Sequence, residues 1–127
     1  MSTNVKDWSG KTILVVEDDK FTSIIIQNFL AKTNAKVITA FTGEQAIEVA
    51  QAHNPDIILM DLKLPGISGH EATRKIKEFL PNSIIIAQTA FVTDIDKAEA
   101  LNAGCSDFLT KPLSSDKIYS TIERFLK

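Results

Sequence analysis

The sequence predicts an α/β domain: a doubly wound, five-stranded parallel sheet with helices on both faces. Short runs rich in Val, Ile and Leu alternate five times with longer segments whose apolar residues recur at helical spacing. Several of the short runs contain no polar residue, which is typical of strands buried on both faces. Parallel strands joined by right-handed crossover helices satisfy both observations.

The length and composition fit one ordinary globular domain. The chain has 127 residues, of which 44% are hydrophobic and 24% charged, and its formal net charge is −2. Its lysines are scattered, which argues against direct contact with nucleic acid, and no apolar run could cross a membrane. The one cysteine, Cys105, excludes an internal disulfide and favours a cytoplasmic location. We expect Cys105 to be a small buried packing residue rather than a reactive thiol.

The chain divides into a lead-in and a folded domain. Residues 1–10 are polar and have no apolar period, so we expect a loose lead-in, whose Trp8 could pack on the domain or on a neighbour. Residues 11–127 form the domain. Its first strand is residues 12–16, and three acids follow that strand directly. Crowded carboxylates repel one another, so they lie on a solvated turn or hold a cation.

The first helix is expected at residues 21–33, where three consecutive isoleucines complicate the pattern. They sweep an arc of roughly 200°, which is wider than one core-facing stripe requires. At least one isoleucine therefore lies near the surface, and we expect this of Ile24 together with Phe21. The inward positions are assigned to Ile25, Phe29 and either Ile26 or Leu30.

The second strand, residues 36–40, alternates only in part and suits an edge of the sheet. Thr42 is the expected N-cap of a helix that runs to His53. Residues 57–60 are four uninterrupted apolar residues between turn signals, and the strand that they form ends in Asp61. In open α/β sheets, ligands bind at the carboxyl ends of the strands, so Asp61 is well placed for chemistry.

The second half of the chain continues the alternation. It contains a charged amphipathic helix at residues 69–80, a strand at 83–87, a helix at 94–103 and a short strand at 107–110. A last helix at residues 115–126 is capped by Ser114 or Ser115, and Gly104 closes the helix before it.

Polar side chains follow four of the five predicted strands, at the edge where the strand ends meet. They are Glu17 and Asp18, Asp61, Thr89 and Lys111. The three acids make a hard-oxygen site for a small divalent cation such as Mg²⁺, with Mn²⁺ as an alternative. A lysine and a threonine are suitable partners for the oxygens of a phosphoryl group. The set therefore predicts phosphoryl transfer to a carboxylate.

At this point the chain resembles the receiver domains of bacterial two-component response regulators, the CheY-like superfamily, from about residue 11 to 127. Each matching motif is weak alone, but together and in this order they are specific. The motifs are Val15-Val16-Glu17-Asp18, residues 60–69, Thr89-Ala90, and Phe108 preceding Lys111-Pro112. The resemblance implies a flavodoxin-like sheet of strand order 2-1-3-4-5.

The resemblance also implies a role for each acid. Asp61 would accept a phosphoryl group from a histidine kinase or a histidine phosphotransfer protein. Asp18, Asp61 and the backbone carbonyl of Lys63 would ligate Mg²⁺ directly, and Glu17 would act through a metal-bound water. The protein would then be a signalling phosphoacceptor rather than an enzyme, one that promotes its own phosphorylation and slow dephosphorylation.

Other residues match the switch of the family. Lys111 would pair with the acceptor and then with the phosphoryl oxygens, and its bond to Pro112 would be cis. Thr89 would move toward the phosphoryl group while Phe108 turns inward. The face formed by the last two helices and the fifth strand would signal to an unknown partner protein.

Docking and turnover of the phosphoryl group involve further residues. By analogy with the family, Phe21 and Ile24 would form the dock for the phosphodonor. Phe91 lies two residues after the threonine and flanks the route of water to the acyl phosphate. We therefore hypothesise that its bulk slows self-dephosphorylation.

Two other functions are weighed against this reading. A flavin-binding electron carrier would need a loop rich in Gly, Ser and Thr after the first strand, and the three acids there would repel a phosphate. The other is a stand-alone phosphatase or a degenerate receiver that only binds partners; the complete set of Asp18, Asp61, Thr89 and Lys111 argues against degeneration, but not against a purely structural use. We expect either a single-domain regulator or the receiver of a hybrid histidine kinase.

Overall fold

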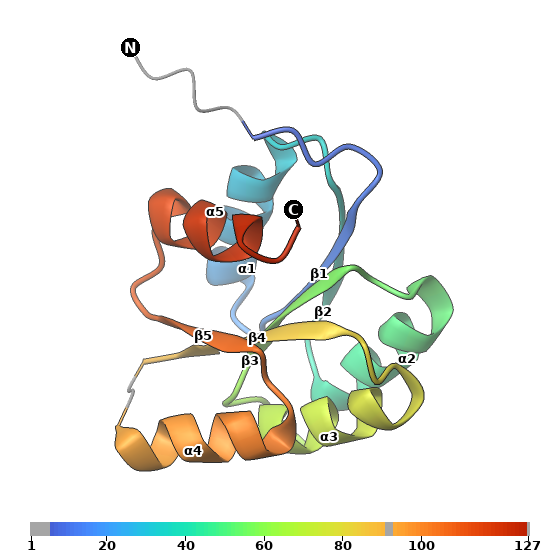
Figure 1. Cartoon of the computed structure of the whole chain (residues 1–127), viewed down its shortest axis with the longest axis vertical. Coiled ribbons are helices and arrows are strands. Elements are labelled where there is room, and N and C mark those ends of the chain that lie inside the picture. Colours follow the sequence, from blue (N-terminus) through green and yellow to red (C-terminus); the bar gives the residue numbers. More distant parts are fainter. Residues whose placement is uncertain (1–5, 91–92, 127) are drawn as a thin grey trace.

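The structure, a computed structural model, describes residues 6–90 and 93–126. Within these ranges, five parallel strands form one sheet of order β2-β1-β3-β4-β5, which confirms the predicted fold class and strand order (Figure 1). The strands are β1 (Thr12–Val16), β2 (Lys36–Ala40), β3 (Ile57–Asp61), β4 (Ile84–Thr89) and β5 (Asp107–Thr110). The helices are α1 (Lys20–Ala31), α2 (Gly43–His53), α3 (Gly69–Phe79), α4 (Asp94–Ala103) and α5 (Ser115–Glu123).

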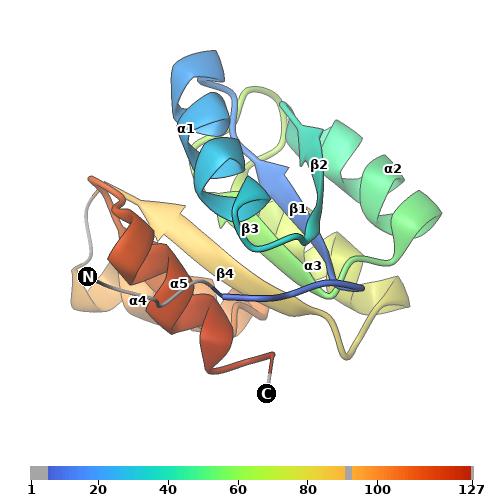
Figure 2. The same cartoon turned by 90° about the horizontal axis from the view of Figure 1, so that it is seen from above.

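The helices lie in two layers around the sheet. Helices α1 and α5 cover one face, and α2, α3 and α4 cover the other (Figures 1 and 2). Each strand sends alternate side chains to the two faces. On β3, Ile57 and Leu59 join the core beneath α1 and α5, whereas Ile58 and Met60 join the core on the opposite face. All four are fully buried, which stabilises the fold by roughly 1.5–3 kcal/mol per side chain.

Each helix begins at a polar N-cap whose side chain accepts a hydrogen bond from a backbone N–H in the first turn. The caps are Asp19, Thr42, Ser68, Thr93 and Ser114. Thr42 is confirmed as a cap, and of the two serines proposed for α5 it is Ser114 that serves. One of the three acids after β1 is thus used to start α1.

The exposure of α1 confirms one expectation and corrects another. Phe21 is 79% and Ile24 is 52% exposed, as expected, but Ile25 is 50% exposed and does not face the core. The buried positions are Ser23, Ile26 and Leu30. Serine is small enough to let the helix approach the sheet, and it accepts a hydrogen bond from Gln27 Nε2 at 3.0 Å. A small polar residue with a hydrogen-bond partner therefore occupies an inward position that the hydrophobic pattern assigned to isoleucine.

Some elements have other bounds than expected. Strand β4 runs from Ile84 to Thr89, so Gln88 and Thr89 belong to the strand and not to the loop that follows it. Helices α1, α3 and α5 end earlier than predicted, at Ala31, Phe79 and Glu123. None of the helices in the described ranges has the length and apolar character needed to cross a membrane.

Within the expected lead-in, Trp8 packs on the domain, which is one of the two alternatives expected for it. Trp8 is only 8% exposed, and its ring meets Tyr119 edge-on with centroids 6.0 Å apart. Its backbone N–H donates to the carbonyl of Thr33 at 2.6 Å. Lys6 pairs with Glu123 at the end of α5, with an N–O distance of 2.7 Å. The segment therefore joins the chain after α1 to α5.

Cys105 is buried, which agrees with its predicted packing role. Its sulfur lies 4.0 Å from the hydroxyl of Thr73 on α3. Burial raises the pKa of the Cys105 thiol, and this disfavours the reactive thiolate.

Candidate functional site

The carboxyl ends of β1, β3, β4 and β5 meet around a pocket of about 390 Å³. Residues from all four strand ends line it, so the structure brings together the polar set that sequence analysis placed at this edge. The lining residues are Glu17, Asp18, Asp19, Thr22, Asp61, Lys63, Thr89, Ala90 and Lys111. Asp19 is the third of the acids that follow β1 and serves as the N-cap of α1, whereas Thr22, in the first turn of that helix, was not predicted to line the site.

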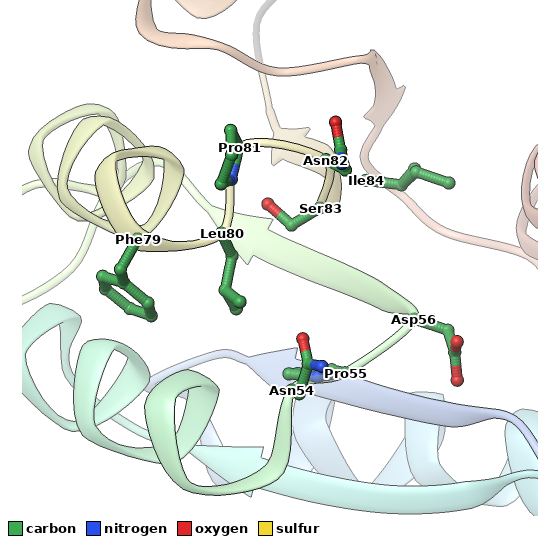
Figure 3. A pocket seen from close by; sticks show the side chains of 9 residues that line it. All are labelled: Asn54, Pro55, Asp56, Phe79, Leu80, Pro81, Asn82, Ser83 and Ile84. Carbon is green, nitrogen blue, oxygen red and sulfur yellow. The ribbon is translucent and has the colours of Figure 1, made fainter.

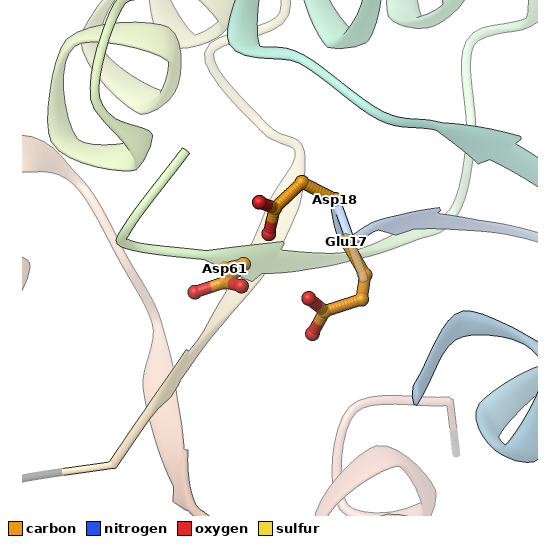
Figure 4. Close-up of side chains that lie close together, drawn as sticks. All are labelled: Glu17, Asp18 and Asp61. Carbon is orange, nitrogen blue, oxygen red and sulfur yellow. The ribbon is translucent and has the colours of Figure 1, made fainter. Parts of the chain in front are cut away.

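Three carboxylates turn toward one space in this pocket (Figure 4). One ligand atom from each of Glu17, Asp18 and Asp61 can be chosen so that all three lie within 4.8 Å of one another. Glu17 is 1% and Asp61 is 4% exposed, whereas Asp18 is open to solvent. Three carboxylate oxygens at this spacing fit a small hard cation such as Mg²⁺. Because the side of Asp18 is open to solvent, such a cation could retain water ligands.

Lys111 offsets part of this negative charge. Its Nζ donates to Glu17 Oε1 at 3.2 Å and to Asp61 Oδ2 at 3.3 Å. The other oxygen of Asp61, Oδ1, accepts a hydrogen bond from the backbone N–H of Lys63 at 3.1 Å. The Lys111–Pro112 peptide bond is cis, as the resemblance implied. Both carboxylate oxygens of Asp61 therefore accept hydrogen bonds, one from the loop after β3 and one from the lysine after β5.

The environment of Glu17 disfavours its charge. Burial raises the pKa of Glu17 to about 7, and the neighbouring charge of Asp61 acts in the same direction. The backbone N–H of Asp19, which donates to Glu17 Oε2 at 3.1 Å, and the Lys111 ammonium lower that pKa only in part. Glu17 thus changes protonation near neutral pH when only the protein surrounds it, and a bound cation would favour its ionised form.

Lys111 keeps its proton in this setting. Partial burial alone would lower the pKa of Lys111, but the charges of Asp61 and Glu17 outweigh that effect and raise it. The lysine is therefore a permanent ammonium at physiological pH. It can follow negative charge that develops next to Asp61.

The turn after β3 allows no side chain at Gly69. A Cβ at this position would overlap the backbone oxygen of Asp61 and lie 2.7 Å from the Cα of Leu62. The N–H of Gly69 donates to the carbonyl of Leu62 at 3.1 Å and so closes the turn. The start of α3 is thereby pressed against the strand end that carries Asp61.

A second group of side chains lies between β4, β5 and α4. Thr89 and Phe108 line a narrow hollow there together with Leu62, Asp96, Lys97 and Ala100. The ammonium of Lys97 lies 5.7 Å from the centre of the Phe108 ring, within the range of a cation–π contact. The Phe108 ring therefore lies against α4. Phe91, the residue assigned to dephosphorylation, lies outside the described residues.

A larger pocket, of about 430 Å³, lies at the opposite edge of the sheet (Figure 3). The loops before β3 and β4, residues 54–56 and 79–84, line it. Its one carboxylate, that of Asp56, already accepts a hydrogen bond from the backbone N–H of Thr12 at 2.8 Å. The chemistry that sequence analysis predicted therefore belongs to the smaller pocket.

Comparison with known proteins points to one family. The model of the response regulator receiver domain matches residues 13–123. The polar-differentiation response regulator DivK of Brucella ovis is 32% identical over 118 residues, which cover 91% of this chain and 96% of DivK.

Solved structures give the same result. The receiver domain of the sensor histidine kinase PA1611 from Pseudomonas aeruginosa PAO1, with a magnesium ion coordinated in its active site cleft, has a TM-score of 0.85 and 33% identity. That match covers 93% of this chain and 98% of the PA1611 receiver-domain chain. The receiver domain of Saccharomyces cerevisiae Ssk1, solved with the histidine phosphotransfer protein Ypd1, has a TM-score of 0.88 and 31% identity, covering 94% and 91% of the two chains.

Proposed function

This chain belongs to the family of response regulator receiver domains, which serve phosphorelay signalling, and we propose that Asp61 is its phosphoacceptor. One observation carries the proposal. The Asp61 carboxylate is almost fully buried, lies beside two further acids, and accepts a hydrogen bond from the Lys111 ammonium at 3.3 Å. This is the arrangement that phosphoryl transfer to a carboxylate requires: an oriented nucleophile and cations for the transferred group.

Each residue of the pocket has a role in the transfer. An oxygen of ionised Asp61 attacks the phosphorus of the donor, and the bond from phosphorus to the donor nitrogen or oxygen breaks. Lys111 donates hydrogen bonds first to Asp61 and then to the incoming phosphoryl oxygens. The hydroxyl of Thr89 donates to another of these oxygens, and the small side chain of Ala90 leaves room for the group.

Mg²⁺ fits the donor set of this pocket. Asp18, Asp61 and the backbone carbonyl of Lys63 would hold it, and Glu17 would act through a bound water. When bound, the cation neutralises charge on the phosphoryl oxygens. Mn²⁺, which prefers the same oxygen ligands, would substitute.

The phosphodonor is a histidine kinase or a histidine phosphotransfer protein, and it docks on α1. Phe21 and Ile24 are 79% and 52% exposed at the end of the helix next to the pocket, and Ile25 adds a third apolar side chain. The co-crystal of Ssk1 with Ypd1 supports a phosphotransfer protein as the kind of partner. The face of α4, β5 and α5 carries the signal onward, because Phe108 and Thr89 link it to the pocket.

Intact mass after incubation with acetyl phosphate tests the proposal. The wild type should gain one phosphoryl group only when Mg²⁺ is present, and Asp61→Asn should gain none. Asp116→Asn removes an exposed acid from the first turn of α5 and should behave as the wild type. A folded wild-type protein that gains no mass in Mg²⁺ would favour a receiver that only binds partners.

A further inference from the structure

Gln88 is a fully buried amide without a partner next to the phosphoacceptor. It is 0% exposed, and neither its Oε1 nor its Nε2 has a hydrogen-bond partner among the described residues. Within the same residues, Ser83 and His70 each leave one buried polar atom unpartnered, but Gln88 leaves two. Buried polar groups are normally hydrogen-bonded, and an unpaired one destabilises the folded state. An unpaired amide at this position needs a physical explanation.

The register of the sheet places this amide beside Asp61. Strand β4 lies between β3 and β5, and Gln88 is paired with Asp61 on one side and with Leu109 on the other (Figure 1). Ile86, two residues before Gln88, belongs to the core beneath α1 and α5, as do Leu59, two residues before Asp61, and Leu109 itself. Because side chains alternate along strands, Gln88 lies on the same face as Asp61. Lys111 follows Leu109 by two residues.

In the resting site, Asp61 and Lys111 make hydrogen bonds with other groups and none with the Gln88 amide. Both oxygens of Asp61 are occupied, by the Lys63 N–H and by Lys111. Lys111 Nζ makes two hydrogen bonds to carboxylates, whereas an ammonium carries three donors. A methionine would fill the same space without an unpaired polar group, so the amide is disadvantageous in this state alone.

We propose that Gln88 is a positioning residue for the phosphorylated form of the site, an inference that rests on the proposed function. A phosphoryl group on Asp61 moves negative charge outward, and the Lys111 ammonium follows it. Gln88 Nε2 then donates to the Asp61 oxygen that Lys111 has left, and Gln88 Oε1 accepts a hydrogen bond from Lys111 Nζ. The amide thus holds both residues in their new places.

The unpaired amide changes the free energy of phosphorylation in one direction. A side chain that is unsatisfied in the resting state and satisfied in the phosphorylated state shifts the balance toward phosphorylation. One hydrogen bond gained in this way favours the phosphorylated form by roughly tenfold. Replacing Gln88 by an apolar residue of similar length should therefore stabilise the resting domain and weaken its response to a phosphoryl group.

Gln88→Met is the variant that tests this, with beryllium fluoride and Mg²⁺ as the phosphoryl analogue. We expect a higher unfolding midpoint without ligand and a dissociation constant for beryllium fluoride that is about tenfold weaker than in the wild type. Ser83→Ala is the matched control, because it removes an unpartnered buried hydroxyl at the opposite edge of the sheet. Its dissociation constant should equal that of the wild type.

The side-chain amide resonances of Gln88, assigned by their absence in Gln88→Met, give a second readout. They should shift when beryllium fluoride is added to the wild type. Equal dissociation constants in wild type and Gln88→Met, or unchanged resonances, would overturn the inference, for example because a buried water satisfies the amide in both states. A wild type that binds no beryllium fluoride and gains no phosphoryl group would instead overturn the proposed function, and this inference with it.

Discussion

The two edges of the sheet carry pockets of similar volume, about 390 Å³ at the carboxyl ends of the strands and about 430 Å³ at the amino ends. At the amino edge the charged groups are matched locally. Asp56 accepts a hydrogen bond from the Thr12 N–H, and Lys77 Nζ donates to the carbonyls of Pro81 and Ser83. At the carboxyl edge, Glu17 and Asp61 both pair with Lys111, and Asp18 and Asp19 add two further acids to the same pocket. Charge that the fold leaves incompletely balanced, rather than volume, therefore marks the edge that carries chemistry.

The largest effect should come from exchanging the lysine at each edge for methionine. Lys111→Met removes the cation beside the acceptor, and phosphorylation by acetyl phosphate should slow by about 100-fold or more. Lys77→Met removes only structural hydrogen bonds, so it should lower the free energy of unfolding by about 1 kcal/mol and leave the phosphorylation rate unchanged. Mass spectrometry over time and urea unfolding measure the two effects. Equal phosphorylation rates in the two variants would contradict the claim that only the carboxyl edge of the sheet takes part in phosphoryl transfer.

The pH dependence of stability should expose the crowded acids directly. The pKa of Glu17 is raised from 4.5 to about 7 in the folded protein, so the folded state binds more protons than the unfolded state between these values. Without Mg²⁺, stability should therefore fall as pH rises from about 4.5 to 7, by up to roughly 3 kcal/mol, and then level off.

Urea unfolding between pH 4.5 and 8 measures this slope, and Glu17→Gln is the variant that isolates it. The variant carries no titrating carboxyl at this position, so its curve should be flatter than that of the wild type. Saturating Mg²⁺ should also flatten the wild-type curve, because the cation favours ionised Glu17. Parallel curves of unfolding free energy against pH for the wild type and the variant would show that burial does not raise the pKa of Glu17.

Two glycines allow a comparison of backbone tolerance at the two edges. Gly69→Ala should destabilise the domain by about 3 kcal/mol, because the new Cβ would overlap the Asp61 backbone. Gly104→Ala, at φ +114° and with its Cβ 3.0 Å from Lys77 Cγ, should cost about 1 kcal/mol. Only Gly69→Ala should also slow phosphorylation, since it alone displaces Asp61. Thermal unfolding together with the acetyl phosphate reaction checks both expectations.

The last effect is the stabilisation of the domain by Mg²⁺. At a concentration ten times its dissociation constant, Mg²⁺ should raise the free energy of unfolding by about 1.4 kcal/mol. Asp18→Asn, which removes a carboxylate from the acidic set, should abolish most of this gain, whereas Asp56→Asn at the opposite edge should retain it. A gain that survives Asp18→Asn would place the cation elsewhere.

Much of this site could be predicted because four of the five strand signals are followed closely by a polar residue that lines the pocket. The bounds of β1, β2, β5 and α4 agree with the sequence prediction, since turn residues flank those segments closely. Asp61 could be assigned because four apolar residues before it leave little doubt about the strand. The grouping of Glu17, Asp18 and Asp61 could be predicted from the parallel topology alone, because the carboxyl ends of parallel strands lie at the same edge of the sheet.

The remaining differences depend on contacts between distant segments. Ile25 is half exposed and Ser23 is buried, the reverse of what their hydrophobicity predicts, because the rotation of α1 on the sheet is set by the packing of Ile26 and Leu30 in the core. The sequence pattern did not place Gln88 in a strand, because a polar residue after an apolar run usually marks the end of the strand. Its strand position depends on pairing with Asp61 and Leu109, which are distant in the sequence. Trp8, for which two packing partners were open, lies against Tyr119 of α5. The role of Phe91 in dephosphorylation stays a prediction.

The docking of Trp8 also supplies an optical signal. It is the one tryptophan in the sequence, and its ring lies edge-on against Tyr119 of α5. Tryptophan emission therefore originates beside α5, which belongs to the face that is proposed to carry the signal onward. No attached dye is needed to follow this face. A change in wavelength or intensity on phosphorylation would follow the rearrangement of α5 in real time, in the natural sequence.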